Sequence, residues 1–284
     1  MKLLTLNTHS WIEESPLEKL EAIKEQLLAD QYDVISLQEV NQSMDAEEAE
    51  VDAFFIAPSH ETVIKKDNFA FLLQQELKKN GLEYYWSWVP SHIGYDQYDE
   101  GIAVLTLFPI TNTRGILLSR KDNYADYHTR KALEVRFQAN EKSYLVYGLH
   151  LSWWQDETES YPFLYEWNKL VEAWESESHK DGNVLLLMGD FNNPAHIEKE
   201  GYSVVSQHPD IKDAYLDATV KNGSHTVVKK IDGWENNSDL LRIDYIFVSS
   251  NLTVHSYETI FDGRMTPVVS DHFGVRVEIG CQAP

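Results

Sequence analysis

Residues 185–194 place a carboxylate and a carboxamide at the end of a strongly apolar segment. An unbroken apolar run of this length predicts a strand that is buried on both faces. Gly189 and the pair Asn193-Pro194 predict that the chain turns where this strand ends. Asp190 and Asn192 are two residues apart, so their side chains are expected to point the same way and to hold a water molecule beside a phosphoryl oxygen. Taken alone, the pattern also fits a polar strand end that feeds a turn.

Further polar side chains stand at the ends of other apolar segments, and their types suit metal-assisted chemistry. They are Asn7, Glu39, Glu100, His150, Asp244, Asp271 and His272. Carboxylate and amide oxygens suit a hard cation such as Mg²⁺. A histidine beside carboxylates suits general acid–base catalysis or the stabilisation of transition-state charge. The sequence has no HExxH motif, cysteine cluster or Walker loop, so zinc-peptidase and P-loop chemistry find no support.

The elements that must position these residues begin with a strand that ends on Asn7. A helix follows, with Ser15 predicted as its N-cap and Glu18 closing a capping box. A second strand ends on Glu39. A strand–helix–strand unit this short is a crossover between parallel strands, so Asn7 and Glu39 are expected at the same edge of one sheet.

The rest of the chain alternates apolar strands with two more amphipathic helices. Predicted strands cover residues 2–7, 33–39, 84–90, 101–107, 133–137, 143–149, 184–188 and 242–248, with a last strand ending near residue 279. One predicted helix starts at residue 15, and two more cover residues 68–79 and 161–177. Residues 91–99 are predicted to be a loop. No repeat, linker or break in composition divides the chain, so residues 1–284 are predicted to form a single domain.

Charge and composition restrict the partners. The chain has 24 basic and 46 acidic residues and a net charge of −22. A field this negative repels nucleic acid and anionic membranes, so neither is expected as a partner. The one cysteine, Cys281, allows no intramolecular disulfide, and neither a signal peptide nor a membrane span is recognised. A cytoplasmic protein is therefore expected.

Seven short motifs, taken together and in order, resemble the endonuclease/exonuclease/phosphatase superfamily. They are Leu6-Asn7-Thr8, Gln38-Glu39, Glu100-Gly101, Gly148-Leu149-His150, Gly189-Asp190-Phe191-Asn192, Arg242-Ile243-Asp244-Tyr245-Ile246 and Ser270-Asp271-His272. Each motif alone would often occur by chance, whereas the joint match is specific. The resemblance implies an α+β fold, a DNase I-like four-layer αββα sandwich of two packed mixed β-sheets flanked by helices, with the site at one rim.

The resemblance also implies a metal site and a site for the attacking water. Glu39 resembles the principal Mg²⁺ ligand of the family, with Asn7 and Asp271 beside it, and Mn²⁺ is a plausible substitute ion. Asp190 resembles the residue that orients or activates the attacking water. Asn192 resembles the residue that contacts the phosphate.

Two histidines complete the implied catalytic set. His272 resembles the essential histidine of the family, oriented by Asp244. His150 resembles its counterpart on the other half of the site, paired with Glu100. From the residues alone, Asp244 could instead pair with Arg242, and His150 could be a structural histidine.

The choice of substrate depends on departures from the nuclease pattern. Asn41 stands where pancreatic-type deoxyribonucleases carry an arginine, which removes a contact to DNA. The segments 91–95, 98–101 and 270–275 resemble a bacterial subgroup, the maltose 6′-phosphate phosphatases. The resemblance therefore implies Mg²⁺-dependent hydrolysis of a sugar phosphate, with maltose 6′-phosphate as the expected substrate. The alternatives are a phosphodiesterase or nuclease on the same scaffold, and a catalytically dead binding protein.

Substrate-binding residues are predicted from side-chain chemistry. Arg130 is the first candidate for the phosphate, because a guanidinium binds two phosphoryl oxygens at once. Tyr98 and Trp153 are candidates for the sugar, because a flat apolar ring with a polar edge suits a sugar face. Trp11 and Trp154 belong to the same aromatic group, although aromatic residues this frequent also fill cores. The oligomeric state is not predicted.

Overall fold

The apolar strands of this chain are buried on both faces, and β8 (Val184–Asp190) illustrates the pattern. Leu186 and Met188 belong to a core between two sheets, whereas Leu185 and Leu187 belong to a second core on the outer side. Because each side chain is buried in one core or the other, such a strand has a continuous apolar sequence. The fold therefore needs a cover on the outer face of each sheet.

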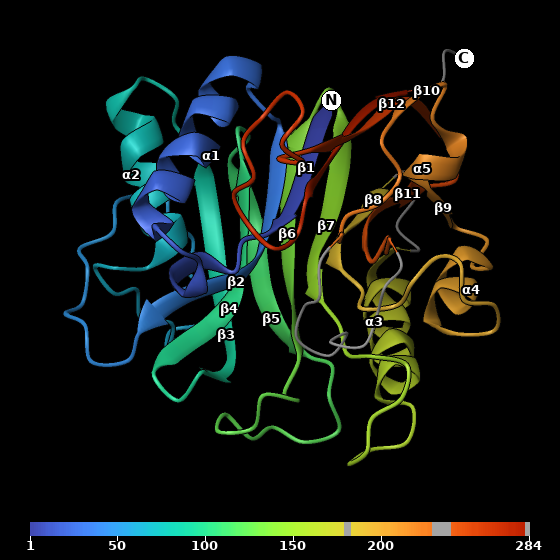
Figure 1. Cartoon of the computed structure of the whole chain (residues 1–284), viewed down its shortest axis with the longest axis horizontal. Helices are drawn as coiled ribbons and strands as arrows, with labels where there is room; N and C mark the ends of the chain where they lie inside the picture. The colour runs from blue at the N-terminus through green and yellow to red at the C-terminus, as the bar shows by residue number, and fades with distance from the viewer. Residues whose placement is uncertain (179–182, 229–239, 282–284) are drawn as a thin grey trace.

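The computed structural model describes residues 1–178, 183–228 and 240–281, and its strands form two packed sheets (Figure 1). The first sheet has the order β10 (Val220–Asn222), β12 (Leu252–Ile260), β13 (Gly274–Cys281), β1 (Lys2–Asn7), β2 (Val34–Ser43), β4 (Tyr98–Thr106), β3 (Tyr85–Gly94). The second has the order β5 (Ile110–Leu117), β6 (Lys131–Ala139), β7 (Lys142–His150), β8, β11 (Asp244–Ser249), β9 (Ile211–Asp213).

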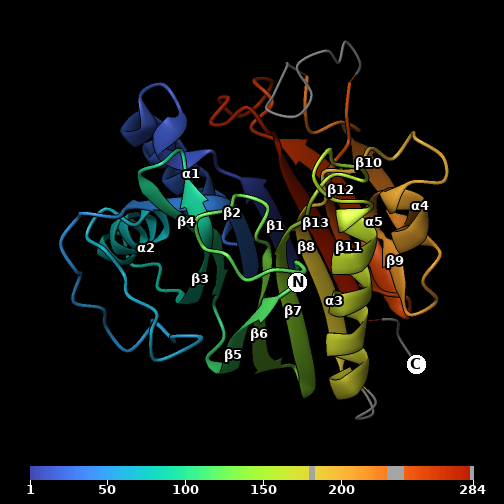
Figure 2. The same ribbon diagram turned by 90° about the horizontal axis from the view of Figure 1, so that it is seen from below.

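Helices cover the outer faces of both sheets, on opposite sides of the molecule (Figure 2). The helices are η1 (Ser10–Ile12), α1 (Pro16–Asp30), α2 (Phe69–Lys79), α3 (Pro162–Ser178), α4 (Gly201–Ser206) and α5 (Ala214–Asp217). Side chains of α1 and α2 share an apolar core with the first sheet, and those of α3 share one with the second. The predicted α+β four-layer sandwich is thus confirmed. No helix in the described ranges is long and apolar enough to cross a membrane.

The predicted crossover at the start of the chain is confirmed, although its cap differs. β1 and β2 are parallel, and Asn7 lies opposite Gln38. Ser15 is the N-cap of α1, but it has a φ of 56° and its side chain makes no capping hydrogen bond. The predicted capping box with Glu18 is therefore wrong, since in this left-handed conformation Ser15 offers the helix only its backbone carbonyl.

Some predicted boundaries were wrong where strands run on past their apolar centres. The predicted loop over residues 91–99 is wrong outside the turn at 95–97, because β3 and β4 form a hairpin with His92 opposite Glu100. The predicted hairpin at Asn140-Glu141 is confirmed, and both residues have the positive φ that a tight turn between strands requires. β5, β12 and the short elements between residues 201 and 222 were not predicted.

Candidate active site

The predicted site residues come from both sheets and meet at one rim of the sandwich. Asn7 ends β1, and Glu39 and Glu100 lie in β2 and β4 of the first sheet. In the second sheet Asp190 lies opposite His150 of the parallel neighbour β7 and opposite Asp244 of the antiparallel neighbour β11. Asp271 and His272 immediately precede β13. Most of the predicted catalytic and metal-binding residues are thereby brought together.

Two local backbone features aim the side chains at this rim. Gly189 has a φ of 155°, and a Cβ there would lie 1.9 Å from the carbonyl oxygen of Leu149. Only glycine therefore lets β7 and β8 approach closely enough to present His150 and Asp190 side by side. Glu39 has a φ of 50° and lies in a bulge of β2, where the register with β4 shifts. Bulges of this kind redirect a side chain at the edge of a site.

Asn7 connects the carboxylates of the two sheets. Its Nδ2 donates hydrogen bonds to Oε1 of Glu39 at 2.8 Å and to Oδ2 of Asp190 at 3.2 Å. His9 follows nearby, with its Nδ1 3.0 Å from Oε1 of Glu13 and 3.8 Å from Oδ1 of Asp271. Negative groups therefore outnumber positive ones in this part of the rim.

The crowding of carboxylates fits a divalent cation. Burial raises the pKa of Glu39 to about 8, and the neighbouring charges of Glu100 and Asp271 add to the effect. An acid with such a pKa is one whose charge lacks compensation from the protein. A hard cation bound by Glu39, Asp271 and the amide oxygen of Asn7 would supply that compensation. The residues predicted to bind Mg²⁺ therefore suit the ion chemically.

Asp190 is a suitable acceptor for a proton from water. Burial and the charge of Asp244 together raise the pKa of Asp190 to about 7, although His272 and the backbone N–H of Asn192 oppose the rise. A general base is most effective when its pKa is near the working pH. The N–H of Asn192 donates to Oδ1 of Asp190 at 2.8 Å, which fixes the carboxylate.

His272 is held as a cation by two buried carboxylates. Its Nδ1 lies 2.9 Å from Oδ2 of Asp244, and its Nε2 lies 3.8 Å from Oδ2 of Asp190. Burial alone would lower the pKa of His272, but the charges of Asp244 and Asp190 outweigh burial and raise that pKa well above its usual range.

Arg242 forms an ion pair with Asp213 at 2.7 Å. The alternative pairing of Asp244 with Arg242 is therefore excluded.

The implied pairing of His150 with Glu100 is wrong. Oε1 of Glu100 lies 3.2 Å from Nε2 of His92, its cross-strand partner in the β3–β4 hairpin. Nε2 of His150 instead lies 3.8 Å from Asp190 and 3.9 Å from Glu39. Burial holds the pKa of His150 well below its ordinary value, and the nearby Arg130 lowers it further. His150 is therefore neutral at physiological pH.

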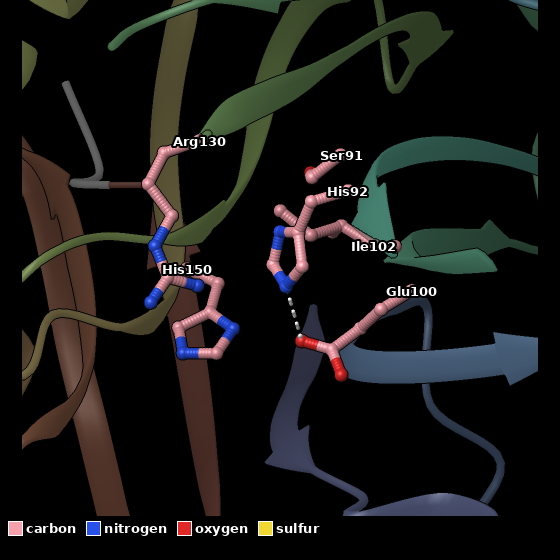
Figure 3. A pocket seen from close by; sticks show the side chains of 7 residues that line it. Ser91, His92, Glu100, Ile102, Arg130 and His150 are labelled. Carbon is pink, nitrogen blue, oxygen red and sulfur yellow. Dashed lines mark ion pairs between the residues drawn. The ribbon is translucent and has the colours of Figure 1, made fainter. Parts of the chain in front are cut away.

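A small cavity adjoins His150, and Arg130 points into it (Figure 3). The lining residues are Ser91, His92, Glu100, Gly101, Ile102, Arg130 and His150. The Arg130 residue is only 5% exposed. Within the described part of the chain, its guanidinium forms no ion pair and its Nε has no hydrogen-bond partner. A buried cation without a partner is costly, so this arginine is arranged for an anion from outside the chain.

The predicted aromatic contacts are only partly supported by position. Tyr98 opposes Gly94 at the tip of the β3–β4 hairpin, and Trp153 follows the site segment that contains His150. Trp11 donates its Nε1 proton to the carbonyl oxygens of Asn41 and Asp67, and Trp154 packs into the outer core under α3. These last two rings are structural.

Asn192 was predicted to contact the phosphate. In the structure its Nδ2 donates a hydrogen bond to the carbonyl oxygen of Leu151 at 2.9 Å.

Two further residues of the site were missed from sequence. Glu166 of α3 accepts hydrogen bonds from the backbone N–H and hydroxyl of Ser152 at 2.8 and 2.6 Å, which fixes the segment after His150. His92 was assigned to a loop, although its separation from Glu100 would place the two opposite each other in a hairpin centred on residue 96.

Comparison with known proteins agrees with this geometry. A family model described as the Endonuclease/Exonuclease/phosphatase family matches residues 10–272. A protein of that family from Leptotrichia buccalis C-1013-b is 31% identical, with a TM-score of 0.84 over 99% of both chains. No curated protein matches the chain.

More distant solved structures share the fold at low identity. The mannosyl-6-phosphatase of Bacteroides thetaiotaomicron VPI-5482 is 16% identical, with a TM-score of 0.68 over 99% of each chain. A truncated TDP2 of Caenorhabditis elegans is 17% identical, with a TM-score of 0.66 over 97% of this chain and 95% of the other. At these identities only the fold is shown. The match over residues 10–272 and the Leptotrichia likeness go further: this chain belongs to the endonuclease/exonuclease/phosphatase family of metal-dependent hydrolases.

Proposed function

We propose that this protein is a Mg²⁺-dependent phosphomonoesterase that releases inorganic phosphate from a phosphorylated sugar, with maltose 6′-phosphate as the expected substrate. The observation that carries the proposal is the buried guanidinium of Arg130, which has no ion-pair partner among the described residues and points into a small cavity beside His150. A terminal phosphate group presents two oxygens to such a guanidinium at once.

Three further features support a small sugar phosphate over nucleic acid. The net charge of −22 repels a polyanion over its whole length but tolerates one phosphate bound at a local cation. Asn41 is fully buried, so it offers no contact to a duplex. The likeness to a mannosyl-6-phosphatase supports a sugar phosphate, although at 16% identity.

In the proposed reaction, Arg130 and the protonated His272 donate hydrogen bonds to the phosphoryl oxygens. Asp190 orients the attacking water and takes one of its protons. A bound Mg²⁺ would be held by Glu39, with Asn7 and Asp271, and would supply positive charge next to the phosphoryl group. The charged donors are most favourable in the transition state, where negative charge spreads over the phosphoryl oxygens.

A substrate panel with Mg²⁺ tests the proposal. The panel contains maltose 6′-phosphate, other hexose phosphates, bis(4-nitrophenyl) phosphate as a diester, and plasmid DNA. We expect phosphate release from one or more sugar monoesters and little turnover of the diester or DNA. Asp190→Asn, prepared in parallel, should remove the activity and thereby exclude a contaminating phosphatase.

The competing function is phosphodiester hydrolysis on the same scaffold, because the name of the matched family includes endonucleases and exonucleases. Cleavage of the diester or nicking of the plasmid at rates comparable with sugar phosphates would overturn the substrate class. Absence of any hydrolysis, with all of the predicted metal and catalytic residues present, would favour a binding protein.

A further inference from the structure

We propose that His92 and Glu100 form the general acid that protonates the departing sugar oxygen. The inference rests on the proposed phosphomonoesterase function and assigns a role to His92 that neither the family motifs nor the comparisons supply. The two residues face each other across the β3–β4 hairpin, and both line the cavity into which Arg130 points (Figure 3).

The hydrogen bonds of His92 fix where its protons lie. Nδ1 of His92 is 3.1 Å from the carbonyl oxygen of Thr129, which can only accept a hydrogen bond, so Nδ1 carries a proton. Nε2 then faces Oε1 of Glu100 at 3.2 Å. Two lone pairs at this distance would repel each other. One proton therefore lies between the imidazole and the carboxylate, whichever of the two atoms holds it.

Both partners of this pair are held in place. The His92 and Glu100 side chains are 5% and 8% exposed. A Cβ on Gly94 would lie 2.5 Å from Oε2 of Glu100, so this glycine leaves the space that the carboxylate occupies. The hydroxyl of Thr129 donates to the carbonyl oxygen of Asn123 at 2.7 Å, which fixes the segment that orients His92. A proton donor needs such a fixed position to be effective.

The position of the pair suits the leaving group. His150 lies within 4 Å of Asp190 on one side and lines the cavity with the pair on the other. In an in-line displacement, the attacking and leaving oxygens are on opposite sides of phosphorus. With water held at Asp190, the sugar oxygen would leave toward His92 and Glu100.

The proton balance closes over one turnover. The water oxygen forms a bond to phosphorus as the bond from phosphorus to the sugar oxygen breaks, and the electron pair of that bond stays on the sugar oxygen. This oxygen takes the proton shared by His92 and Glu100, while the water proton passes to Asp190. Exchange with solvent then returns a proton to the pair and removes one from Asp190.

The test compares two leaving groups in the wild-type enzyme, His92→Gln and Glu100→Gln. Each variant keeps a hydrogen bond across the hairpin but removes the proton that the imidazole and the carboxylate share. A sugar alkoxide needs protonation, whereas 4-nitrophenolate leaves as a stable anion. We expect kcat/KM to fall by about 10²-fold or more for the sugar phosphate and by less than about 10-fold for 4-nitrophenyl phosphate, within the usual range for a general acid. Measurements at saturating Mg²⁺ separate this effect from changes in metal affinity.

His208→Gln is the matched control, because this histidine packs against Trp167 and Trp174 away from the cavity and should leave both rates unchanged. Equal losses on both substrates would overturn the inference and leave the proposed function intact. A wild-type enzyme that hydrolyses no sugar phosphate would overturn the proposed function instead.

If either variant does not fold, as judged by thermal melting, the other still provides the comparison. The wild-type enzyme provides an independent one. With a general acid in place, kcat/KM should depend only weakly on leaving-group basicity across a series of phenyl and alkyl phosphates, and a steep dependence would overturn the inference.

Discussion

Replacing Arg130 with methionine should make the protein more stable and nearly inactive. The guanidinium is buried beside the neutral His150, its Nε has no partner, and no described carboxylate lies within ion-pair distance. Methionine has a similar length and no charge. In the absence of substrate, the substitution therefore removes a buried group that the protein does not satisfy.

The two effects can be given magnitudes. An unsatisfied buried polar group costs about 1–3 kcal/mol, so Arg130→Met should raise the free energy of unfolding by about that amount. Two hydrogen bonds from a guanidinium to phosphate contribute about 1.5–3 kcal/mol each. Loss of both corresponds to a fall of about 10²–10⁴-fold in kcat/KM.

Urea unfolding in EDTA and steady-state kinetics in Mg²⁺ measure these effects separately. Inorganic phosphate adds a third readout, because a ligand at 100 times its Kd stabilises the folded state by about 2.7 kcal/mol. Phosphate should stabilise the wild type and not the variant. Arg276→Met is the control, because Arg276 is ion-paired with Asp30 and Glu258. This control should lose stability and keep activity.

A variant of Arg130 that is less stable than the wild type and retains activity within about 10-fold would refute the reasoning, since the expected loss is at least 10²-fold. That outcome would mean that the guanidinium supports the fold and not the phosphate.

Three further predictions concern the metal, the catalytic pair and a buried acid. EDTA should abolish hydrolysis and Mg²⁺ or Mn²⁺ should restore it, whereas full activity in metal-free protein would contradict the role of Glu39. Asp190→Asn and His272→Ala should each lower kcat/KM by about 10²–10⁴-fold, and the double variant should be little worse than the less active single variant. If either single variant keeps more than half of the wild-type activity, the active site has been assigned to the wrong residues. Burial raises the pKa of Glu166 from 4.5 to about 7, so wild-type stability is favoured at acidic pH and loses about 3 kcal/mol as the pH rises from 4.5 through 7. Glu166→Gln should lack this loss, and parallel pH profiles of unfolding free energy for the two proteins would contradict the assignment.

Much of the fold was predictable because its central strands are apolar on both faces. The elements that were missed lack that signal. In β12 a bulge between Val254 and Ser256 shifts the register, so the buried residues Leu252, Val254 and Tyr257 do not keep a period of two. In β5 most side chains are partly or fully exposed. Neither strand therefore has a clear period in its apolar residues.

The site was predictable in composition and less so in pairing. The residue types of Asp190, Glu39 and His272 follow from the sequence and the family resemblance, and so does the position of Asp190 at the end of β8. The predicted strand end at Glu39 is wrong, because β2 continues to Ser43. The partner of Glu100 does not follow from the sequence, because it depends on whether residues 91–99 continue the hairpin, and the polar sequence there resembles a loop. The absence of an ion pair at Arg130 depends on where the fold places the nearest carboxylates, such as that of Glu166, and this is a property of the tertiary structure alone.

The hydrogen bonds of Asn7 span the boundary between the two sheets, and the hydroxyl of Ser36 donates across the same boundary to the carbonyl oxygen of Met188 at 3.2 Å. Each sheet therefore carries only part of the catalytic residues. The distances between the catalytic residues of the two sheets depend on how the sheets are positioned relative to each other. A change of volume in the apolar layer between them would shift that alignment without touching substrate. Substitutions in the core far from the rim would thus change the rate of hydrolysis. Partial loosening of the packing between the sheets would abolish hydrolysis while the strands themselves remain folded.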